Sequence, residues 1–578
     1  MQLRSAVTCV LSLLIVPACE RHPAAPPPQP AQPSSPTAAV EPARTTPPLP
    51  ATVADWAKGA RSFDGLGDFH RKVTTQSNDA QQYFDQGMRF LWAFNHDEST
   101  RSFARAAQLD PQCALCYWGV ALTVGPNYNL PSIAESRAKV AAEAVALARK
   151  YAAQATPVEQ ALIAALALRY PDARPLDPSS SAPVLKAYAE AMHSVAIRFP
   201  DDLDVQTLYA ESLMTMNAWK LWSPDGGPAP GTREIQTTLE RVLARDPLHS
   251  GANHYYVHTM EASPHPEKAI AAAERLPGLV PASGHLVHMP AHIMQRVGRY
   301  EEAALANRNG AAVDQAYLAQ AVPPDYYTLI YTGHNYQFLA YSAAMEGRKA
   351  ETLKAVSESR RVTSDEKLLE IPGFDWPLAE QYTALVRFGL WDEMLAQAPP
   401  SSKFAALTGG YLYGRGMALA AKGRVEEAAK TVGELIALSG AQPADSPAGM
   451  NTMHDVLALA AAVVQARIVA AQRRPEEAIA LLREAAARED RLAYNEPPDW
   501  FFPVRHLLGA QLLETKRPAA AEAVYREDLK HNPANGWSLY GLVEALRLQN
   551  KLSEAAKVEQ QFQAAWKHSD ITLHASAF

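Results

Sequence analysis

The sequence predicts an all-α protein built from many helical hairpins in a row, and three observations support this. A short phrase recurs along the chain, as Gly-Arg-Tyr-Glu-Glu-Ala at 298–303, Gly-Arg-Val-Glu-Glu-Ala at 423–428 and Arg-Pro-Glu-Glu-Ala at 474–478, with shorter forms at 266–269 and 552–556. The stretches between the copies are apolar at helical spacing, and several end at a proline, as in Asp110-Pro111, Pro200-Asp201, Asp246-Pro247 and Asn532-Pro533. No stretch shows the alternating pattern of a strand.

The phrase resembles the turn of the tetratricopeptide repeat, a pair of antiparallel helices of about 34 residues. The clearest copy runs from Ala80 to Pro111. The resemblance implies that residues 56–578 form one α-solenoid, in which stacked hairpins build a right-handed superhelix with a concave groove. About half of the residues are hydrophobic (48%) and 20% are charged, which fits a folded body of this kind.

The N-terminal residues predict an export signal. Residues 1–18 carry one basic residue, Arg4, and then an apolar run that is too short for a stable membrane span. Val16-Pro17-Ala18-Cys19 resembles the lipobox of bacterial lipoproteins, which implies a lipidated Cys19, although plain cleavage after Ala18 is an alternative. Residues 19–55 would then be a tether, because 11 of the 28 residues from Pro23 to Pro50 are proline. The resulting expectation is a lipid-anchored protein of the periplasm-facing cell envelope, at the outer membrane, whose membrane contact is the lipid alone.

Two cysteines remain in the predicted mature body, Cys113 and Cys116. In an exported protein this pair predicts a short-range disulfide or a structural pair at a helix start, with a metal site or two free thiols as alternatives. Tyr117 follows the pair where a haem-attachment motif would have histidine.

Histidine is the unusual feature of the composition. The chain has 17, and eight of them lie between His249 and His334. In the tetratricopeptide family, positions 2, 5, 9, 12 and 13 of the first helix face the groove. Applying that register to three consecutive hairpins at about 250–345 implies that six histidines face the groove: His254, His258, His285, His288, His292 and His334.

The spacing of these histidines predicts a transition-metal site. His254 and His258 are four residues apart, as are His288 and His292, so each pair lies on one helix face. His285 and His334 extend the cluster in one direction and Glu261 in the other. The set can hold one ion with three or four imidazoles, or two ions, and imidazole suits Cu, Fe and Zn.

The functional prediction is a metal-dependent enzyme, either an oxidase or oxygenase or a hydrolase, that acts on a small molecule or peptide in the groove. Glu261 and Tyr341 are the candidate catalytic residues, Glu261 as a ligand or general base at the end of the histidine face. The alternative is a non-catalytic scaffold whose groove binds a peptide or an envelope partner, as most tetratricopeptide proteins do. In such a scaffold, the imidazoles would bind a peptide through its carboxylate groups.

The charge balance argues against a nucleic-acid partner. Lys and Arg total 54 against 61 Asp and Glu, a formal net charge of -7, so the chain as a whole has no basic excess for phosphate binding. Two segments interrupt the helical pattern, Gly125-Pro-Asn-Tyr-Asn129 and Glu496-Pro-Pro-Asp-Trp500. They are candidates for groove-lining loops, with no chemistry assigned to them.

Overall fold

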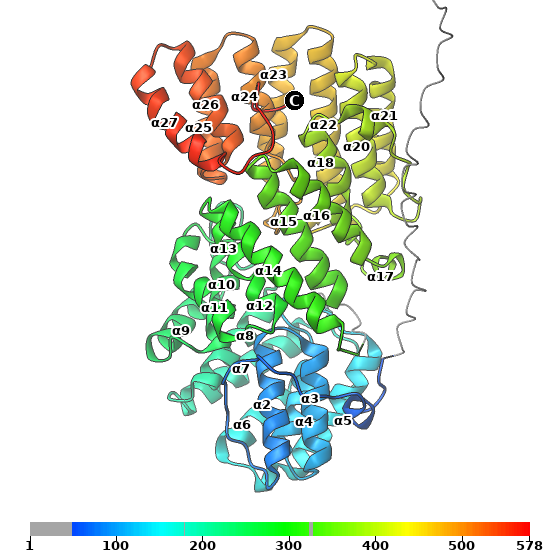
Figure 1. The fold of residues 1–578 in the computed structure, drawn as a ribbon. Coiled ribbons are helices and arrows are strands. Elements are labelled where there is room, and N and C mark those ends of the chain that lie inside the picture. Colours follow the sequence, from blue (N-terminus) through cyan, green and yellow to red (C-terminus); the bar gives the residue numbers. More distant parts are fainter. Residues whose placement is uncertain (1–48, 178–179, 323–326) are drawn as a thin grey trace, which may run out of the picture. The chain divides into compact units, whose positions relative to one another are not determined.

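The structure, a computed structural model, describes residues 49–177, 180–322 and 327–578. The predicted signal at 1–18, Cys19 and most of the predicted tether lie outside the described residues. Within them helices predominate and strands are limited to two of two residues each (Figure 1), which confirms the predicted all-α class.

The helices follow the hairpin rhythm of the sequence. The first part of the chain contains α1 (Val53–Ala57), α2 (Asn78–Trp92), α3 (His96–Leu109), α4 (Ala114–Thr123), α5 (Glu135–Tyr151), η1 (Ala152–Gln154), α6 (Pro157–Ala167), α7 (Ala182–Arg198), α8 (Leu203–Met216), α9 (Thr232–Arg245) and α10 (Ser250–Met260). The middle contains η2 (Pro266–Ala269), α11 (Ile270–Leu279), α12 (Gly284–His288), α13 (Pro290–Arg296), α14 (Tyr300–Leu318), the π-helical turn η3 (Thr328–Thr332), α15 (Gly333–Met345), α16 (Lys349–Val362), α17 (Asp365–Glu370), η4 (Pro377–Ala379), α18 (Glu380–Arg387) and α19 (Trp391–Leu395).

The last part contains α20 (Ala405–Ala421), α21 (Val425–Gly440), α22 (Met453–Ala471), α23 (Pro475–Glu489), α24 (Val504–Glu514), α25 (Pro518–His531), α26 (Gly536–Leu548) and α27 (Leu552–Ala565). Two short antiparallel strands, β1 (Pro447–Ala448) and β2 (Asn451–Thr452), precede α22, with Pro447 opposite Thr452 and Ala448 opposite Asn451. Helix α22 is long and apolar enough to span a membrane, but 61% of its most apolar window is buried inside the protein, as in a core helix.

Successive helices pack against each other as hairpins, and the first helices of neighbouring hairpins also touch, as α20 does α22 and α24 does α26. The predicted first hairpin, Ala80 to Pro111, corresponds to α2 and α3. Gly298 and Gly423 have φ of 79° and 74° in the turns before α14 and α21, a left-handed conformation that glycine adopts without strain. This explains the glycine of the recurring phrase.

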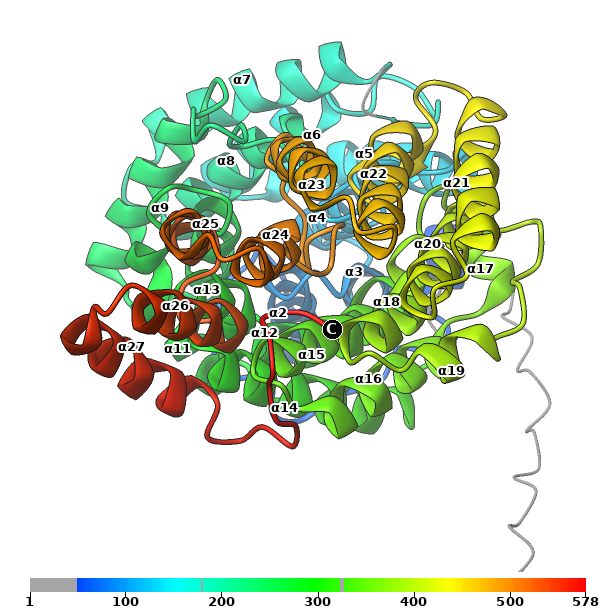
Figure 2. The same cartoon turned by 90° about the horizontal axis from the view of Figure 1, so that it is seen from above.

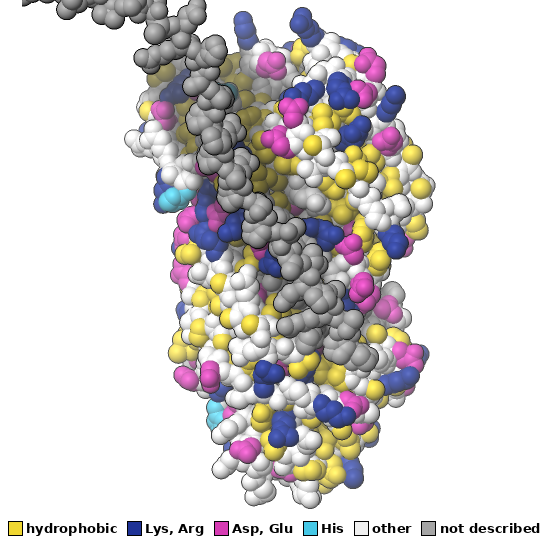
Figure 3. Space-filling view, turned by 45° about the vertical axis from the view of Figure 1, so that its right-hand side comes forward, with side chains coloured by type: hydrophobic (Ala, Val, Ile, Leu, Met, Phe, Trp, Pro, Cys, Tyr) yellow, Lys and Arg dark blue, Asp and Glu magenta, His cyan; other side chains and the backbone are white. Residues whose placement is uncertain are grey.

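Seen from above, the helices of the described part wind around a common centre (Figure 2). The buried apolar side chains form two main cores, one from Val53 to Tyr331 and one from Leu329 to Ala555. Cys113 and Cys116 form the predicted disulfide at the start of α4. The face shown in Figure 3 has interspersed basic and acidic side chains and only isolated histidines.

Candidate metal centre

The six predicted histidines come together in the structure, and they sort into two groups of three. We call His254, His258 and His285 triad A, and His288, His292 and His334 triad B. Within each triad, one nitrogen of every imidazole lies within 4.8 Å of the others. The first five of these histidines are at most 1% exposed, and His334 is partly exposed. The structure therefore confirms that the two i, i+4 pairs lie close together. The third imidazole of each triad comes from another helix, His285 in triad A and His334 in triad B.

Triad A is built by α10 and the start of α12. His254 and His258 lie one turn apart on α10, and Nε2 of His254 lies 3.0 Å from Nε2 of His285. The Phe94 ring packs on all three imidazoles, with centroid distances of 4.6 to 6.0 Å. Phe94 has φ of 53° in the turn between α2 and α3, where a bulky side chain costs about 1–3 kcal/mol. It stands where other hairpins have glycine, and this brings an aromatic wall to the site.

Triad B is built by α12, α13 and α15. Pro290 begins α13 between His288 and His292, and Nε2 of His288 lies 2.6 Å from Nε2 of His292. His334 follows the π-helical turn η3 at the start of α15. Phe338, one turn further along α15, packs against all three imidazoles at centroid distances of 5.4 to 5.6 Å.

Oxygen acceptors hold the Nδ1 side of four imidazoles. His254 Nδ1 donates to the Trp92 carbonyl at 2.6 Å, and His288 Nδ1 donates to Oδ1 of Asn307 at 2.7 Å. His258 and His292 both pair through Nδ1 with the Glu261 carboxylate, at 3.1 and 2.9 Å. A proton held on Nδ1 leaves a lone pair on Nε2, the tautomer that binds metal ions.

Two imidazole nitrogens of triad A lack a hydrogen-bond partner in the part of the chain that the structure describes. Nε2 of His258 and Nδ1 of His285 are buried with no hydrogen-bond partner among the described residues. The short Nε2–Nε2 contact in each triad is closed either by a hydrogen bond, with one imidazole protonated on Nε2, or by a metal ion between the two nitrogens. A buried polar atom without a partner costs about 1–3 kcal/mol.

Burial also favours the neutral form of five of these imidazoles. It lowers the pKa of His254, His258, His285 and His288 well below the usual range, and neighbouring histidines lower it further. The pKa of His334 falls to about 3, through burial and then through His292 and His258. Neutral imidazole is the form that coordinates metal ions.

Two carboxylates stand behind the imidazoles. Burial raises the pKa of Glu261 well above its usual range, and Glu496 raises it further. Glu496 also has a pKa raised by burial, and its carboxylate pairs with His292 Nδ1. Glu261, predicted as catalytic, lies at the end of α10 and bridges His258 and His292, so it orients one imidazole of each triad. His258, Glu261 and His292 also form a third group with ligand atoms within 4.8 Å.

The structure does not bring Tyr341 to the imidazoles, contrary to the prediction. Tyr341 packs with Tyr300 and Met345, and its hydroxyl donates to Asn532 at 3.4 Å. It lies two turns beyond His334 on α15, and there it faces the C-terminal hairpins instead of the triads. Burial also raises its pKa, which makes the hydroxyl a poor proton donor at neutral pH.

Glu496 is the residue that the sequence interpretation missed. It belongs to the segment 496–500, where the helical pattern is interrupted, and the superhelix carries this segment back to α13. Tyr128, in the other interrupting segment, packs on His258 with a centroid distance of 5.3 Å. The interruptions were the available signal, but their position beside α10 and α13 follows only from the winding of the chain.

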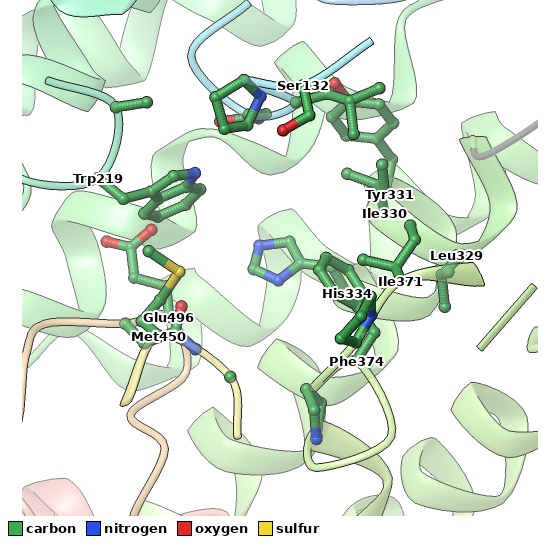
Figure 4. A pocket seen from close by; sticks show the side chains of 18 of the residues that line it. Ser132, Trp219, Leu329, Ile330, Tyr331, His334, Ile371, Phe374, Met450 and Glu496 are labelled. Carbon is green, nitrogen blue, oxygen red and sulfur yellow. The ribbon is translucent and has the colours of Figure 1, made fainter. Parts of the chain in front are cut away.

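The triads open into a cavity of about 730 Å³. His285, His292 and His334 line it, and Figure 4 shows His334 projecting between Glu496 and Trp219 on one side and apolar side chains on the other. Most of the labelled lining is apolar or aromatic: Trp219, Leu329, Ile330, Tyr331, Ile371, Phe374 and Met450. Glu261 and Tyr341 are not among the lining residues. The cavity is lined by residues from both cores, and its lining extends along the chain from Leu49, before α1, to Phe501, before α24.

Neither a protein-family model nor a curated protein matches the sequence. Among solved structures, the chain is similar to a human IFIT1 dimer with m7Gppp-AAAA, with 10% identity over 85% of this chain and 91% of that one and a TM-score of 0.31. Yeast Tom70 has 12% identity over 85% of this chain and 91% of its own, with a TM-score of 0.29. The TPR domain of P58(IPK) has 13% identity over 82% of this chain and 99% of its own, with a TM-score of 0.22.

The absence of a nucleic-acid partner stays a prediction. The hairpins of the chain itself, with their left-handed turns and stacked first helices, confirm the tetratricopeptide-type helical array that the sequence predicted.

Proposed function

We propose that triads A and B hold one or two transition-metal ions, and that the protein is a metal-dependent enzyme acting on a small molecule in the adjoining cavity. The observation that supports this most strongly is the arrangement of imidazole nitrogens. Oxygen acceptors fix Nδ1 of His254, His258, His288 and His292 from behind, and the Nε2 atoms converge in front. Oriented, neutral imidazoles backed by carboxylates are typical of metal sites in proteins.

A proton shared between two imidazoles accounts for only one short contact. A metal ion in each triad accounts for the convergence of all three imidazoles. One proton can close the His288–His292 contact, but it leaves Nε2 of His258 without a hydrogen-bond partner among the described residues. A metal ion satisfies three nitrogens at once. The two-triad arrangement therefore favours two ions, one in each triad.

Three imidazoles leave a coordination position open on a four-coordinate ion, which is the pattern of catalytic sites. Triad B faces the cavity through His292 and His334, and triad A through His285. An all-imidazole donor set suits Cu, Fe and Zn. Oxidase or oxygenase chemistry would use a redox-active ion, and hydrolysis would use metal-bound water.

The cavity favours a small, largely apolar molecule over an extended peptide. Its labelled walls are mostly apolar, and Trp219 projects into it from a backbone with φ of 62°. In the C-terminal part, residues after α27 fold back on the hairpins, where Ser576 bonds to Tyr525 and to the His506 carbonyl at 2.7 Å each. The chain itself thus occupies groove surface that a peptide would need.

We also propose the location expected from the N-terminal sequence, a lipid-anchored protein at the outer membrane that faces the periplasm. The Cys113–Cys116 disulfide fits an oxidising compartment. Palmitate labelling of the wild type and a Cys19→Ala variant tests the anchor. Label retained in the variant would contradict it.

The metal proposal is tested by elemental analysis of protein purified without an affinity tag. We expect about one equivalent of Cu, Fe or Zn for each occupied triad. His254→Ala with His258→Ala should remove the ion of triad A, and His288→Ala with His292→Ala that of triad B. His265→Ala with His531→Ala is the control, since both side chains are more than half exposed.

The scaffold is the outcome that would overturn the proposal. Metal-free protein that neither binds added Cu, Fe or Zn nor changes its melting temperature with them would mean that the imidazoles are held by protons. The protein would then be a non-catalytic binding scaffold.

A further inference from the structure

A row of three tyrosines leads away from triad A. The Tyr331 ring lies 4.7 Å from that of His285, Tyr327 lies 5.0 Å from Tyr331, and Tyr317 lies 5.1 Å from Tyr327, all between centroids. These are distances of directly packed aromatic rings. Each tyrosine is 5–6% exposed. The row ends at Phe63, 5.7 Å from Tyr317 and only partly buried.

The two outer tyrosines each have a carboxylate as proton acceptor. Tyr327 donates to Oδ1 of Asp314 at 2.9 Å, and Tyr317 donates to Oε2 of Glu98 at 3.3 Å. Thr332 and Asn335 hold the other oxygen of Asp314. Burial raises the pKa of Asp314 to about 7, so this carboxyl group can keep a proton near neutral pH.

We propose that Tyr331, Tyr327 and Tyr317 form a redox relay. One electron from Tyr327 and one from Tyr317 pass along the row to a copper or iron ion in the triads, so that the oxidation ends on these two tyrosines. The inference rests on the proposed metal centre and narrows its chemistry to a redox-active ion, because zinc cannot take up an electron. The oxidant is hydrogen peroxide, reduced at the centre when no substrate fills the cavity. The relay would protect the imidazoles from oxidation.

The electrons and protons balance as follows. Tyr327 loses one electron through the Tyr331 ring to the centre and passes its proton to Asp314. Tyr317 loses a second electron along the same row and passes its proton to Glu98. One hydrogen peroxide takes up the two electrons and two solvent protons, its O–O bond breaks, and two water molecules form. Two neutral tyrosyl radicals remain.

Tyr255 shows what a tyrosine outside the relay looks like. Its ring lies 5.4 Å from that of His254, so it is about as close to triad A as Tyr331 is. Its hydroxyl, however, is buried with no hydrogen-bond partner among the described residues. Its ring packs on Trp92 and Phe94. A tyrosine that cannot release its proton is a poor one-electron donor, and Tyr255→Phe is therefore the matched control.

The test is freeze-quench EPR of untagged full-length protein, loaded with copper or iron and exposed to hydrogen peroxide without substrate. We expect a tyrosyl radical in the wild type and in Tyr255→Phe. In Tyr327→Phe the signal should fall several-fold, and mass spectrometry should find more oxidised histidine in the triads. Tyr317→Phe is the second variant, expected to lower the signal and to shift the radical to Tyr327.

Two results would overturn the relay. One is a metal-loaded wild type that gives no tyrosyl radical, and the other is an unchanged radical in the Tyr327→Phe, Tyr317→Phe double variant. Melting temperature and bound metal are measured for every variant, so that misfolding is recognised. Absence of bound metal in the wild type would contradict the metal centre itself, whereas bound metal without a radical contradicts only the relay.

Discussion

Buried histidine occurs in two environments in this protein, and the contrast shows what a metal site requires. His506 on α24 is 1% exposed, and both of its nitrogens have unlike partners: Nε2 donates to Asp528 at 3.0 Å, and Nδ1 accepts from Arg387 at 2.9 Å. Although burial alone would raise the pKa of Asp528, His506 holds it below its usual value. The histidines of triads A and B instead face one another. Burial alone therefore does not mark a ligand, but inward nitrogens without unlike partners do.

Removing the His506 side chain should cause a large loss of unfolding free energy, because this histidine has a structural role and not a metal-binding one. His506→Ala leaves Asp528 and Arg387 buried without their shared partner, which costs about 3–5 kcal/mol of unfolding free energy. Denaturant unfolding in the presence of a chelator measures this loss, and His531→Ala, at an exposed position, should stay close to wild type. A loss below about 1 kcal/mol would mean that the contacts of His506 with Asp528 and Arg387 do not stabilise the fold.

Stabilisation by metal should depend on the histidines of the two triads alone. An ion that binds only the folded state adds about 4 kcal/mol when its free concentration is roughly 1,000 times the Kd. Thermal unfolding with and without metal should show this gain for each occupied triad in the wild type and in His531→Ala, and His288→Ala with His292→Ala should lose the gain of triad B. Equal gains in that double variant would show that the ion binds elsewhere.

Glu261 should tune the site without forming it. Glu261→Gln keeps the shape of the side chain but replaces the carboxyl group that pairs with His258 and His292. Loss of such an orienting partner lowers metal affinity by about 10- to 100-fold. Competition with a chromophoric chelator measures the Kd, and Glu267→Gln, at an exposed site, is the control. Unchanged affinity would mean that Glu261 does not orient the imidazoles.

Per pH unit, acidification should have the smallest effect, and it isolates one imidazole. The pKa of His334 is about 3 in the folded metal-free protein, against about 6.5 in an unfolded chain. Below pH 6.5 only the unfolded state takes up this proton, so stability falls with pH, by up to about 1.4 kcal/mol per unit, until about pH 3. The unfolding free energy of metal-free wild type minus that of His334→Gln should follow this slope. A difference that is constant with pH would contradict it.

The fold could be predicted because its signals are local. The turn glycines, such as Gly298 and Gly423, and the prolines after α3 and α25 mark each hairpin within a few residues. The six histidines could be predicted for the same reason, since one repeat register places them all. Their division into two triads could not, because it depends on how α10, α12 and α15 pack.

The residues around the triads show where sequence reasoning ends. Glu496 lies about 200 residues from His292, and only the winding of the superhelix brings them together. Phe94 was hidden because it occupies a turn position that usually holds glycine. Tyr341 was misplaced because the groove register was extended two turns beyond His334, where α15 turns toward Asn532.

The most direct test of the central claim is a crystal structure of the untagged, metal-loaded protein with anomalous data at the absorption edge of the metal found in it. We expect an anomalous peak in each triad, about 2.0–2.1 Å from three imidazole nitrogens. His254, His258 and His285 should surround one peak and His288, His292 and His334 the other. Ordered imidazoles at full metal loading with no anomalous peak in either triad would contradict the account.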